Sequence, residues 1–194
     1  MKKIIDKKIF LVIAITSVIG LMFGIMFLFL LDKVDKLLIK TELIDFIDLI
    51  KSSEYNIKES IINTSIDNIF HFILIFIFST IFILSPCTLF ISFYNLFTVG
   101  FLISSMFYTF KLKGILYIFY LLFPFKLLNI IVSLIFIMYS LKYSKKIYLF
   151  FKTNEKINIK EYTKRYSLLF LIFVISSIIL SILEIYTSIF LIKL

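Results

Sequence analysis

Long apolar stretches separated by short polar segments are the dominant pattern along this chain of 194 residues. The longest, 69–110, contains no Asp, Glu, Lys or Arg in its 42 residues. A helix needs about 20 apolar residues to cross a bilayer, so this stretch is long enough for two crossings. Pro86 interrupts it, and a proline lacks the backbone N–H that a continuous helix needs. We therefore predict two spans, 69–84 and 88–110, that fold back at Pro86.

Three further apolar stretches predict one crossing each, over 9–31, 115–141 and 168–191. The first is longer than the apolar core of a signal peptide, about 7–15 residues, so we expect it to be retained as a signal anchor. The fold class that follows is all-α: a polytopic membrane helical bundle with five transmembrane helices. No segment is long enough to form a separate soluble core, so residues 1–194 are expected to form a single membrane domain.

The polar segment 32–67 is the longest between the expected spans. Apolar positions at helical spacing predict an amphipathic helix over 39–50, resting on the membrane surface or on neighbouring spans. Its opposite face carries acidic residues, which form either a solvated face or a docking surface for a partner. These are Glu42, Asp45 and Asp48. The following residues, 52–64, are polar and are expected to be irregular.

Charge predicts the orientation, because cytoplasmic segments of membrane proteins collect Lys and Arg. Residues 1–8 contain four lysines and 142–165 contain eight Lys or Arg, whereas 32–67 contains eight acidic residues and five lysines. We therefore predict both basic segments inside, the 32–67 segment outside, the N-terminus inside and the C-terminus outside. Five crossings satisfy this arrangement only if 69–110 crosses twice. A re-entrant hairpin is the competing topology.

Composition supports a membrane protein and argues against other classes. The chain is 61% hydrophobic with 25 Phe, and its mean hydropathy is +1.08, whereas a soluble domain has about 45–50% apolar residues. The formal charge of +9 resides in short polar segments, so we expect the lipid bilayer and no nucleic acid as a partner. Cys87 is the single cysteine, which excludes an internal disulfide and makes a thiolate metal site improbable.

Two charged residues, Lys126 and Glu184, lie within expected spans. Either side chain would cost about 2.5–3.5 kcal/mol if exposed to lipid, so each should face protein or water. Serines recur with Glu184 at intervals of four, three and four and form one polar stripe on the last span. They are Ser177, Ser181 and Ser188.

We hypothesise that this stripe packs against the broken centre of the fourth span, with Lys126 and Glu184 paired. Pro124 leaves the carbonyl of Tyr120 without its helical donor, and Asn129 adds a polar group almost one turn beyond Lys126. The alternative is that Lys126 reaches water by itself and that Glu184 is protonated.

Other constellations give no sign of catalysis. His71 is the only histidine and follows Asp67 by one helical turn, next to the expected membrane surface, where a capped interfacial residue is the more common role. The sequence has no His-Glu-x-x-His, no paired intramembrane acids and no Gly-rich phosphate loop. We expect no enzyme, no catalytic or metal-binding residues and no cofactor. Gly20 and Gly24 form a Gly-x-x-x-Gly pattern, which serves either a contact with another span of the chain or dimerisation.

In this order and spacing the features resemble the stage II sporulation protein M family of endospore-forming bacteria over nearly the full length. The features that match, in chain order, are Gly20 and Gly24, the long outer segment, Ser85-Pro86, the aromatic-polar-glycine stretch 93–101 with Asn95 and Gly100, Pro124, the basic segment and the glutamate-bearing last span. Ser79 and Ile131 depart from the family pattern, which often has a glycine-rich second span and a second proline in the fourth span.

The resemblance implies a non-enzymatic scaffold in the bacterial cell membrane. Such a scaffold recruits peptidoglycan hydrolases, a lytic transglycosylase and an amidase/endopeptidase, at the septal membrane during engulfment in endospore formation. The acidic face of 39–50 is then the candidate docking face, and Gly20, Gly24 and Gly100 allow close helix packing. The alternative is a permease-like transport component with a polar pathway around Lys126 and Glu184. The oligomeric state is left open.

Overall fold

The computed structural model describes residues 7–52, 55–153 and 158–193. These residues form seven α-helices and one 3₁₀ helix, and five of the helical segments are long and apolar enough to cross a membrane. The predicted all-α bundle with five long apolar helices is therefore confirmed. The elements are α1 (Lys7–Leu30), α2 (Lys33–Lys51), α3 (Ile57–Thr80), η1 (Phe82–Leu84), α4 (Cys87–Phe110), α5 (Lys113–Leu122), α6 (Phe125–Thr153) and α7 (Ile159–Lys193).

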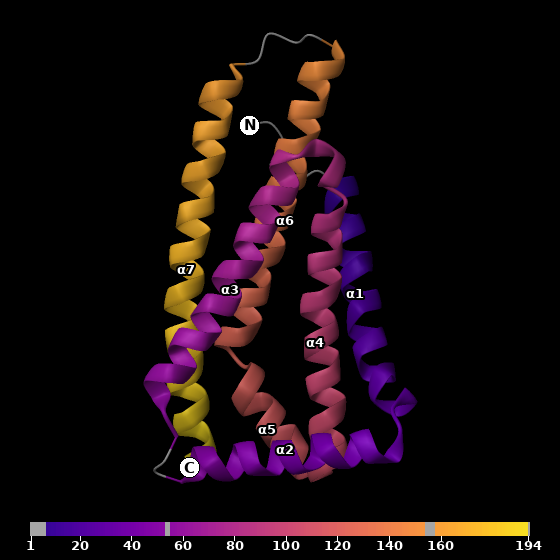
Figure 1. The fold of residues 1–194 in the computed structure, drawn as a ribbon, viewed down its shortest axis with the longest axis vertical. Coiled ribbons are helices and arrows are strands. Elements are labelled where there is room, and N and C mark those ends of the chain that lie inside the picture. The colour runs from indigo at the N-terminus through magenta and orange to yellow at the C-terminus, as the bar shows by residue number, and fades with distance from the viewer. Residues whose placement is uncertain (1–6, 53–54, 154–157, 194) are drawn as a thin grey trace.

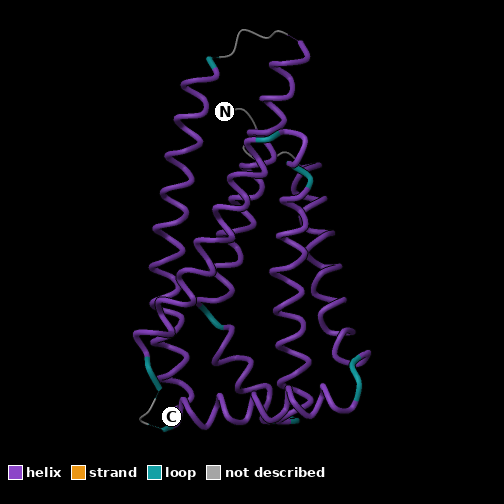
Figure 2. Tube along the Cα trace, in the orientation of Figure 1, coloured by secondary structure: helices purple, strands orange, loops and turns teal. Residues whose placement is uncertain are grey.

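The long helices stand side by side, and α2 lies across one end of the bundle (Figure 1). Short loops join the helices throughout the described chain, as the tube in Figure 2 shows. Helix α1 packs mainly against α4, whereas α3, α6 and α7 pack against one another. Fewer contacts join these two groups, and α5 lies beside α4 and α7 near the α2 end. The end that carries α2 is called the α2 end below, and the opposite end, where α6 finishes and α7 begins, is called the basic end.

The second and third crossings fold back on each other, but the break precedes Pro86. Helix α3 finishes at Thr80, and the 3₁₀ helix Phe82–Leu84 carries the chain into the turn. Pro86 then immediately precedes α4, with helical backbone angles. A proline is tolerated at a helix start, where a missing N–H costs nothing. The predicted span 69–84 is thus corrected at its end, because Pro86 begins a helix and does not kink one.

Helix α3 begins at Ile57, so the expectation that 52–64 is irregular was wrong for most of that segment. The side chain of Asn56 caps the helix by accepting a hydrogen bond from the N–H of Glu59, and it donates to the Glu59 carboxylate at 3.2 Å. This reciprocal cap supports a helix whose first turns are polar. As a result α3 is longer than the predicted span and its midpoint lies near His71.

The fourth crossing is broken. Helix α5 ends at Leu122 and α6 begins at Phe125, so the expected span 115–141 is two helices that meet at Pro124. The basic segment 142–165, which lies between the expected fourth and fifth spans, is likewise mostly helical, because α6 continues to Thr153 and α7 begins at Ile159. Lysine and arginine are good helix formers, so these helices continue through their polar ends.

Helix α2 covers Lys33–Lys51, which is longer than the predicted 39–50. Its apolar face rests on neighbouring helices, since Ile47 and Ile50 are buried in a cluster with Ile189 and Ile192 of α7. Residues of the opposite face are exposed, including the three predicted acidic residues Glu42, Asp45 and Asp48. Helix α2 is therefore anchored to the bundle by its second half.

Glycine contacts join α1 to α4. A Cβ added at Gly20 would meet the carbonyl oxygen of Phe93, and one at Gly24 would meet that of Phe97. From the other side, a Cβ at Gly100 would meet the carbonyl oxygen of Leu21. The backbones of the two helices therefore approach closely at all three glycines, as small residues allow. The interpretation of Gly20 and Gly24 as an intrachain contact is confirmed.

Candidate functional site

Four residues on one face of α7 form a buried polar stripe, and each of them bonds to another helix. Their exposed fractions are 0% for Ser177 and Ser181, 8% for Glu184 and 7% for Ser188. The partners come from α3, α5 and α6, so the stripe joins three helices. Polar side chains inside a membrane bundle act in this way because lipid offers them no hydrogen bonds.

The charged members of the site are Lys126 and Glu184, with Nζ 3.3 Å from Oε1. The Lys126 side chain is 34% exposed and that of Glu184 is 10% exposed. Lys126 is the second residue of α6, where the helix dipole disfavours a cation and the first N–H groups lack helical acceptors. The carboxylate of Glu184 offsets the first of these effects by supplying a negative charge beside the ammonium. The hypothesis that Lys126 and Glu184 pair is confirmed.

The hydroxyls of the stripe engage the broken fourth crossing. Ser177 donates to the side-chain oxygen of Asn129 at 2.7 Å, and Ser188 donates to the backbone carbonyl of Tyr120 at 3.1 Å. That carbonyl is the one that Pro124 leaves without a helical donor. The hypothesis that this stripe packs against the broken centre of the crossing is therefore confirmed.

A third helix joins the stripe through Asn68 of α3, which donates to Ser181 at 2.8 Å. Sequence reasoning missed this residue because it placed Asn68 at the edge of a loop. The signal was nevertheless present: Thr64, Asn68 and His71 recur at intervals of four and three, so they share one face of a helix.

A cavity of about 270 Å³ lies between α3, α4 and α6, and most of the residues that line it are polar. Its polar lining residues include Asp67, Asn68, His71, Asn95, Lys126 and Asn129. Asn95 also donates to Ser133 of α6 at 3.3 Å. This space is called the polar cavity below.

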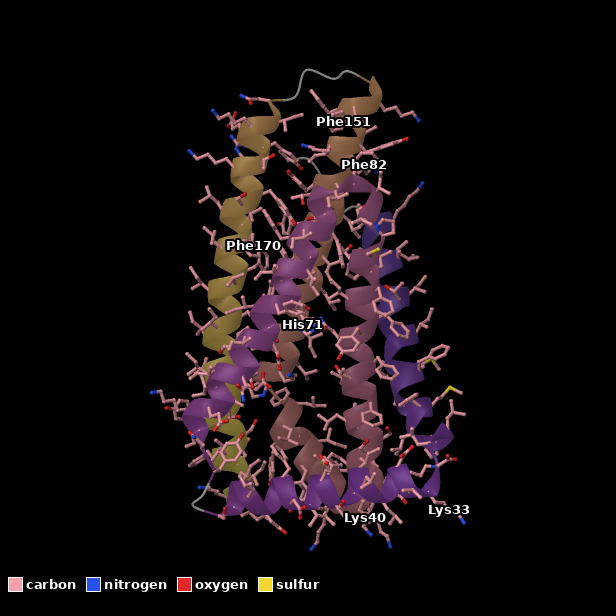
Figure 3. All side chains as sticks on the ribbon, in the orientation of Figure 1. Lys33, Lys40, His71, Phe82, Phe151 and Phe170 are labelled. Atoms are coloured by element: carbon pink, nitrogen blue, oxygen red, sulfur yellow. The ribbon has the colours of Figure 1, made fainter. Side chains whose placement is uncertain are left out.

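His71 lies in the polar cavity, near the middle of the bundle's length (Figure 3). The sequence placed His71 near the start of a span, but α3 begins twelve residues before the predicted span, at residue 57 and not 69, so His71 lies well inside the helix. The His71 ring packs on that of Tyr94, with 5.9 Å between their centres.

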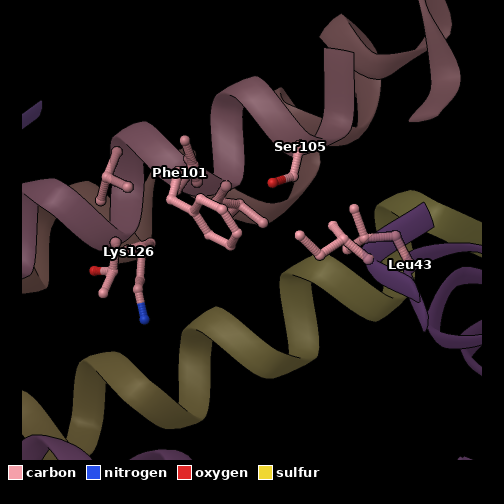
Figure 4. A pocket seen from close by; sticks show the side chains of 9 residues that line it. Leu43, Phe101, Ser105 and Lys126 are labelled. Carbon is pink, nitrogen blue, oxygen red and sulfur yellow. The ribbon is translucent and has the colours of Figure 1, made fainter. Parts of the chain in front are cut away.

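A second cavity of about 300 Å³ lies between α2, α4 and α5, and Lys126 of α6 is among its lining residues. Its walls are mostly apolar and include Leu43, Phe101 and Leu122 (Figure 4). It shares Thr98 and Lys126 with the polar cavity. The polar cavity and this mostly apolar one therefore adjoin at Thr98 and Lys126.

A further buried polar cluster surrounds Tyr166, outside the predicted site. Its hydroxyl lies 2.5 Å from that of Ser79 and 2.7 Å from that of Ser140. Ser133, Ser140 and Ser144 line the buried face of α6 at intervals of seven and four, and this periodicity is the signal that could have found the cluster. The other predicted residues are not among the partners of the stripe: the three glycines serve the contact between α1 and α4, Pro86 precedes α4, and the acidic face of α2 is exposed.

Fold and site define a polytopic helical membrane protein with an ion pair and a polar stripe inside its bundle. Comparisons with protein-family models, curated proteins and solved structures gave no match.

Proposed function

We propose that this protein is a non-catalytic membrane scaffold that recruits peptidoglycan hydrolases at the septal membrane during engulfment in endospore formation. The single observation that carries the proposal is α2, a polar platform fixed across one end of the bundle. Burial of Ile47 and Ile50 fixes α2 on α7, while Glu42, Asp45 and Asp48 stay exposed. The motif resemblance supplies the class of partner, a lytic transglycosylase and an amidase/endopeptidase.

A scaffold needs a docking surface that keeps its shape when the partner is absent. The polar stripe and the Lys126–Glu184 pair serve this need, because they lock α7 to α3, α5 and α6. Helix α2 rests on the same α7. In this proposal the buried polar groups have a structural role, and mutating them affects partner capture through instability of the platform.

The test is capture of hydrolase activity by the tagged protein from sporulating cells. Wild type should retain activity that releases fragments from purified peptidoglycan, and a variant with Glu42→Lys, Asp45→Lys and Asp48→Lys should lose it. Lys33→Gln with Lys40→Gln is the matched control, because both lysines are exposed on the same helix (Figure 3). Absence of hydrolase activity from the wild-type eluate would contradict the proposal. So would equal hydrolase activity in the eluates of wild type and of the acidic-face variant.

A transport component is the second candidate, and the two cavities that meet at Lys126 favour it. Intramembrane ionisable residues commonly mark pathways, and broken helices line the sites of many transporters. Asn95→Leu with Thr98→Leu narrows the polar cavity without touching the ion pair. A scaffold carrying these changes should accumulate and capture hydrolases normally. If this variant accumulates normally and captures hydrolases normally, but does not restore function to a strain that lacks the protein, the result would favour transport.

A further inference from the structure

The basic end of the bundle contains a cavity that the proposed function does not use. It has a volume of about 570 Å³ and lies between α6 and α7. Four cationic side chains line it: Lys142, Lys145, Lys146 and Arg165. No acidic side chain belongs to its described lining. We call this space the basic cavity.

The floor of the basic cavity is a stack of tyrosine rings. The ring of Tyr143 lies 4.1 Å from that of Tyr166 and 5.5 Å from that of Tyr162, at interplanar angles of 13° and 14°. Tyr143 and Tyr166 are each only 3% exposed. The Tyr143 hydroxyl bonds to that of Thr163 at 3.0 Å. Stacking and hydrogen bonds therefore fix the floor in one arrangement before any ligand arrives.

The cationic rim is positioned on this floor. The Lys146 ammonium lies 4.5 Å from the ring centre of Tyr162, and that of Lys142 lies 5.8 Å from the ring centre of Tyr139. A ring face attracts a cation without neutralising its charge. Arg165 pairs with Glu161 of its own helix, but both side chains are exposed, at 73% and 56%, where such pairs contribute little. Lys146 and Arg165 therefore both present positive charge beside an aromatic floor.

We propose that the basic cavity binds the phosphate-bearing headgroup of an anionic phospholipid. Lysine and arginine recognise phosphate by charge-assisted hydrogen bonds, and basic pockets between membrane helices are known to hold such headgroups. Leu149 and Leu169 complete the lining, so the start of an acyl chain meets an apolar wall beside the headgroup. The positive-inside rule assigns this end to the cytoplasmic leaflet.

The experiment measures lipid retention by native mass spectrometry of the full chain, released from detergent with phosphatidylglycerol, cardiolipin or phosphatidylcholine added. Wild type should retain the two anionic lipids and should not retain phosphatidylcholine. The variant Lys142→Gln, Lys146→Gln, Arg165→Gln should bind the anionic lipids roughly tenfold to a hundredfold more weakly, given the attraction of each cation for an anionic headgroup.

The matched control is Lys152→Gln, Lys160→Gln, Lys164→Gln, which removes the same charge from the same two helices outside the cavity lining. Lys152 also lies over a tyrosine ring, that of Tyr148, at 5.6 Å. This control should keep most of the wild-type affinity. Equal weakening of the two variants would overturn the proposal in favour of diffuse surface charge. If the cavity variant does not fold, Lys146→Glu alone, at an exposed side chain, provides the same comparison against Lys152→Glu.

A second arm separates the lipid from a free anion. Glycerol phosphate and inorganic phosphate are added as competitors at millimolar concentration. Little displacement of bound phosphatidylglycerol is expected, because neither competitor has an acyl chain to bury. Displacement by inorganic phosphate at the concentration of the lipid itself would identify a soluble anion site and would overturn the lipid assignment.

Discussion

The hydroxyl of Ser188 on α7 donates a hydrogen bond to the backbone carbonyl of Tyr120 on α5, at 3.1 Å. In a continuous helix this carbonyl would accept from the residue at position 124, but Pro124 has no N–H to give. A side chain 68 positions away in the sequence thus supplies the donor that the local backbone lacks. The break in the fourth crossing and the polar stripe on the fifth are therefore two parts of one arrangement.

The coupling of these positions can be measured. Ser188→Ala should lower the free energy of unfolding in mixed micelles by about 1 kcal/mol, the usual contribution of one hydrogen bond in a membrane protein. In a Pro124→Ala background the loss should be smaller, because residue 124 then has an N–H of its own. Thr187→Val is the control, since the Thr187 hydroxyl bonds only to carbonyls of its own helix. Equal losses in both backgrounds would show that the two positions act independently.

The ion pair predicts a different pattern. Glu184→Gln leaves the Lys126 ammonium inside the bundle without its counter-charge, so the free energy of unfolding should fall by about 2–3 kcal/mol. The double change Lys126→Leu, Glu184→Leu should cost less than the sum of the two single changes to Leu, because no charge remains unpaired. Lys160→Leu, at an exposed position in the first turn of α7, should have little effect. Strictly additive losses would exclude an energetic coupling between the partners.

Hydropathy predicted which parts of the chain form crossings, but it did not predict where the helices end. The reason is physical: apolar length reports the part of a helix in contact with lipid, whereas a helix can continue into water with a cap. Asn56 and Glu59 form such a cap and extend α3 well beyond its apolar part. Prolines were only partly informative, since Pro124 separates two helices and Pro86 begins one.

The part of the candidate site that could be predicted from the sequence is the part whose side chains are costly to bury. A charge within an apolar stretch demands a partner, which is why Lys126 and Glu184 were identifiable. Single hydroxyls make no such demand, because a serine in a helix can satisfy itself on a carbonyl of the preceding turn. Ser79 bonds to the carbonyl of Phe76 in this way while also meeting Tyr166. Its role across the bundle was therefore visible only in three dimensions.

The close contact between α1 and α4 predicts that Gly100 cannot be replaced by a larger residue without loss of stability. Gly100→Ala should gain up to about 1 kcal/mol of helix propensity, yet its Cβ meets the carbonyl of Leu21 and forces the helices apart. We expect a net loss of about 1–2 kcal/mol, measured as a lower unfolding free energy in micelles. Val18→Leu adds bulk to the exposed face of α1 and should be neutral. A stabilising Gly100→Ala would show that the contact is looser than the structure indicates.

The orientation of the bundle in the membrane determines where the α2 docking face and the basic cavity lie. Residues 142–165 contain eight Lys or Arg, so the basic end should face the cytoplasm and the α2 end the exterior. In a Cys87→Ser background, Lys40→Cys and Lys146→Cys each introduce one thiol at an exposed position. A membrane-impermeant maleimide applied to intact cells should label the first variant, and it should label the second only after permeabilisation. The reverse pattern would turn α2 away from the cell wall, which removes the proposed docking face, and would move the basic cavity to the outer leaflet. Labelling of both thiols in intact cells would place the two ends of the bundle on one side of the membrane, which five complete crossings do not permit.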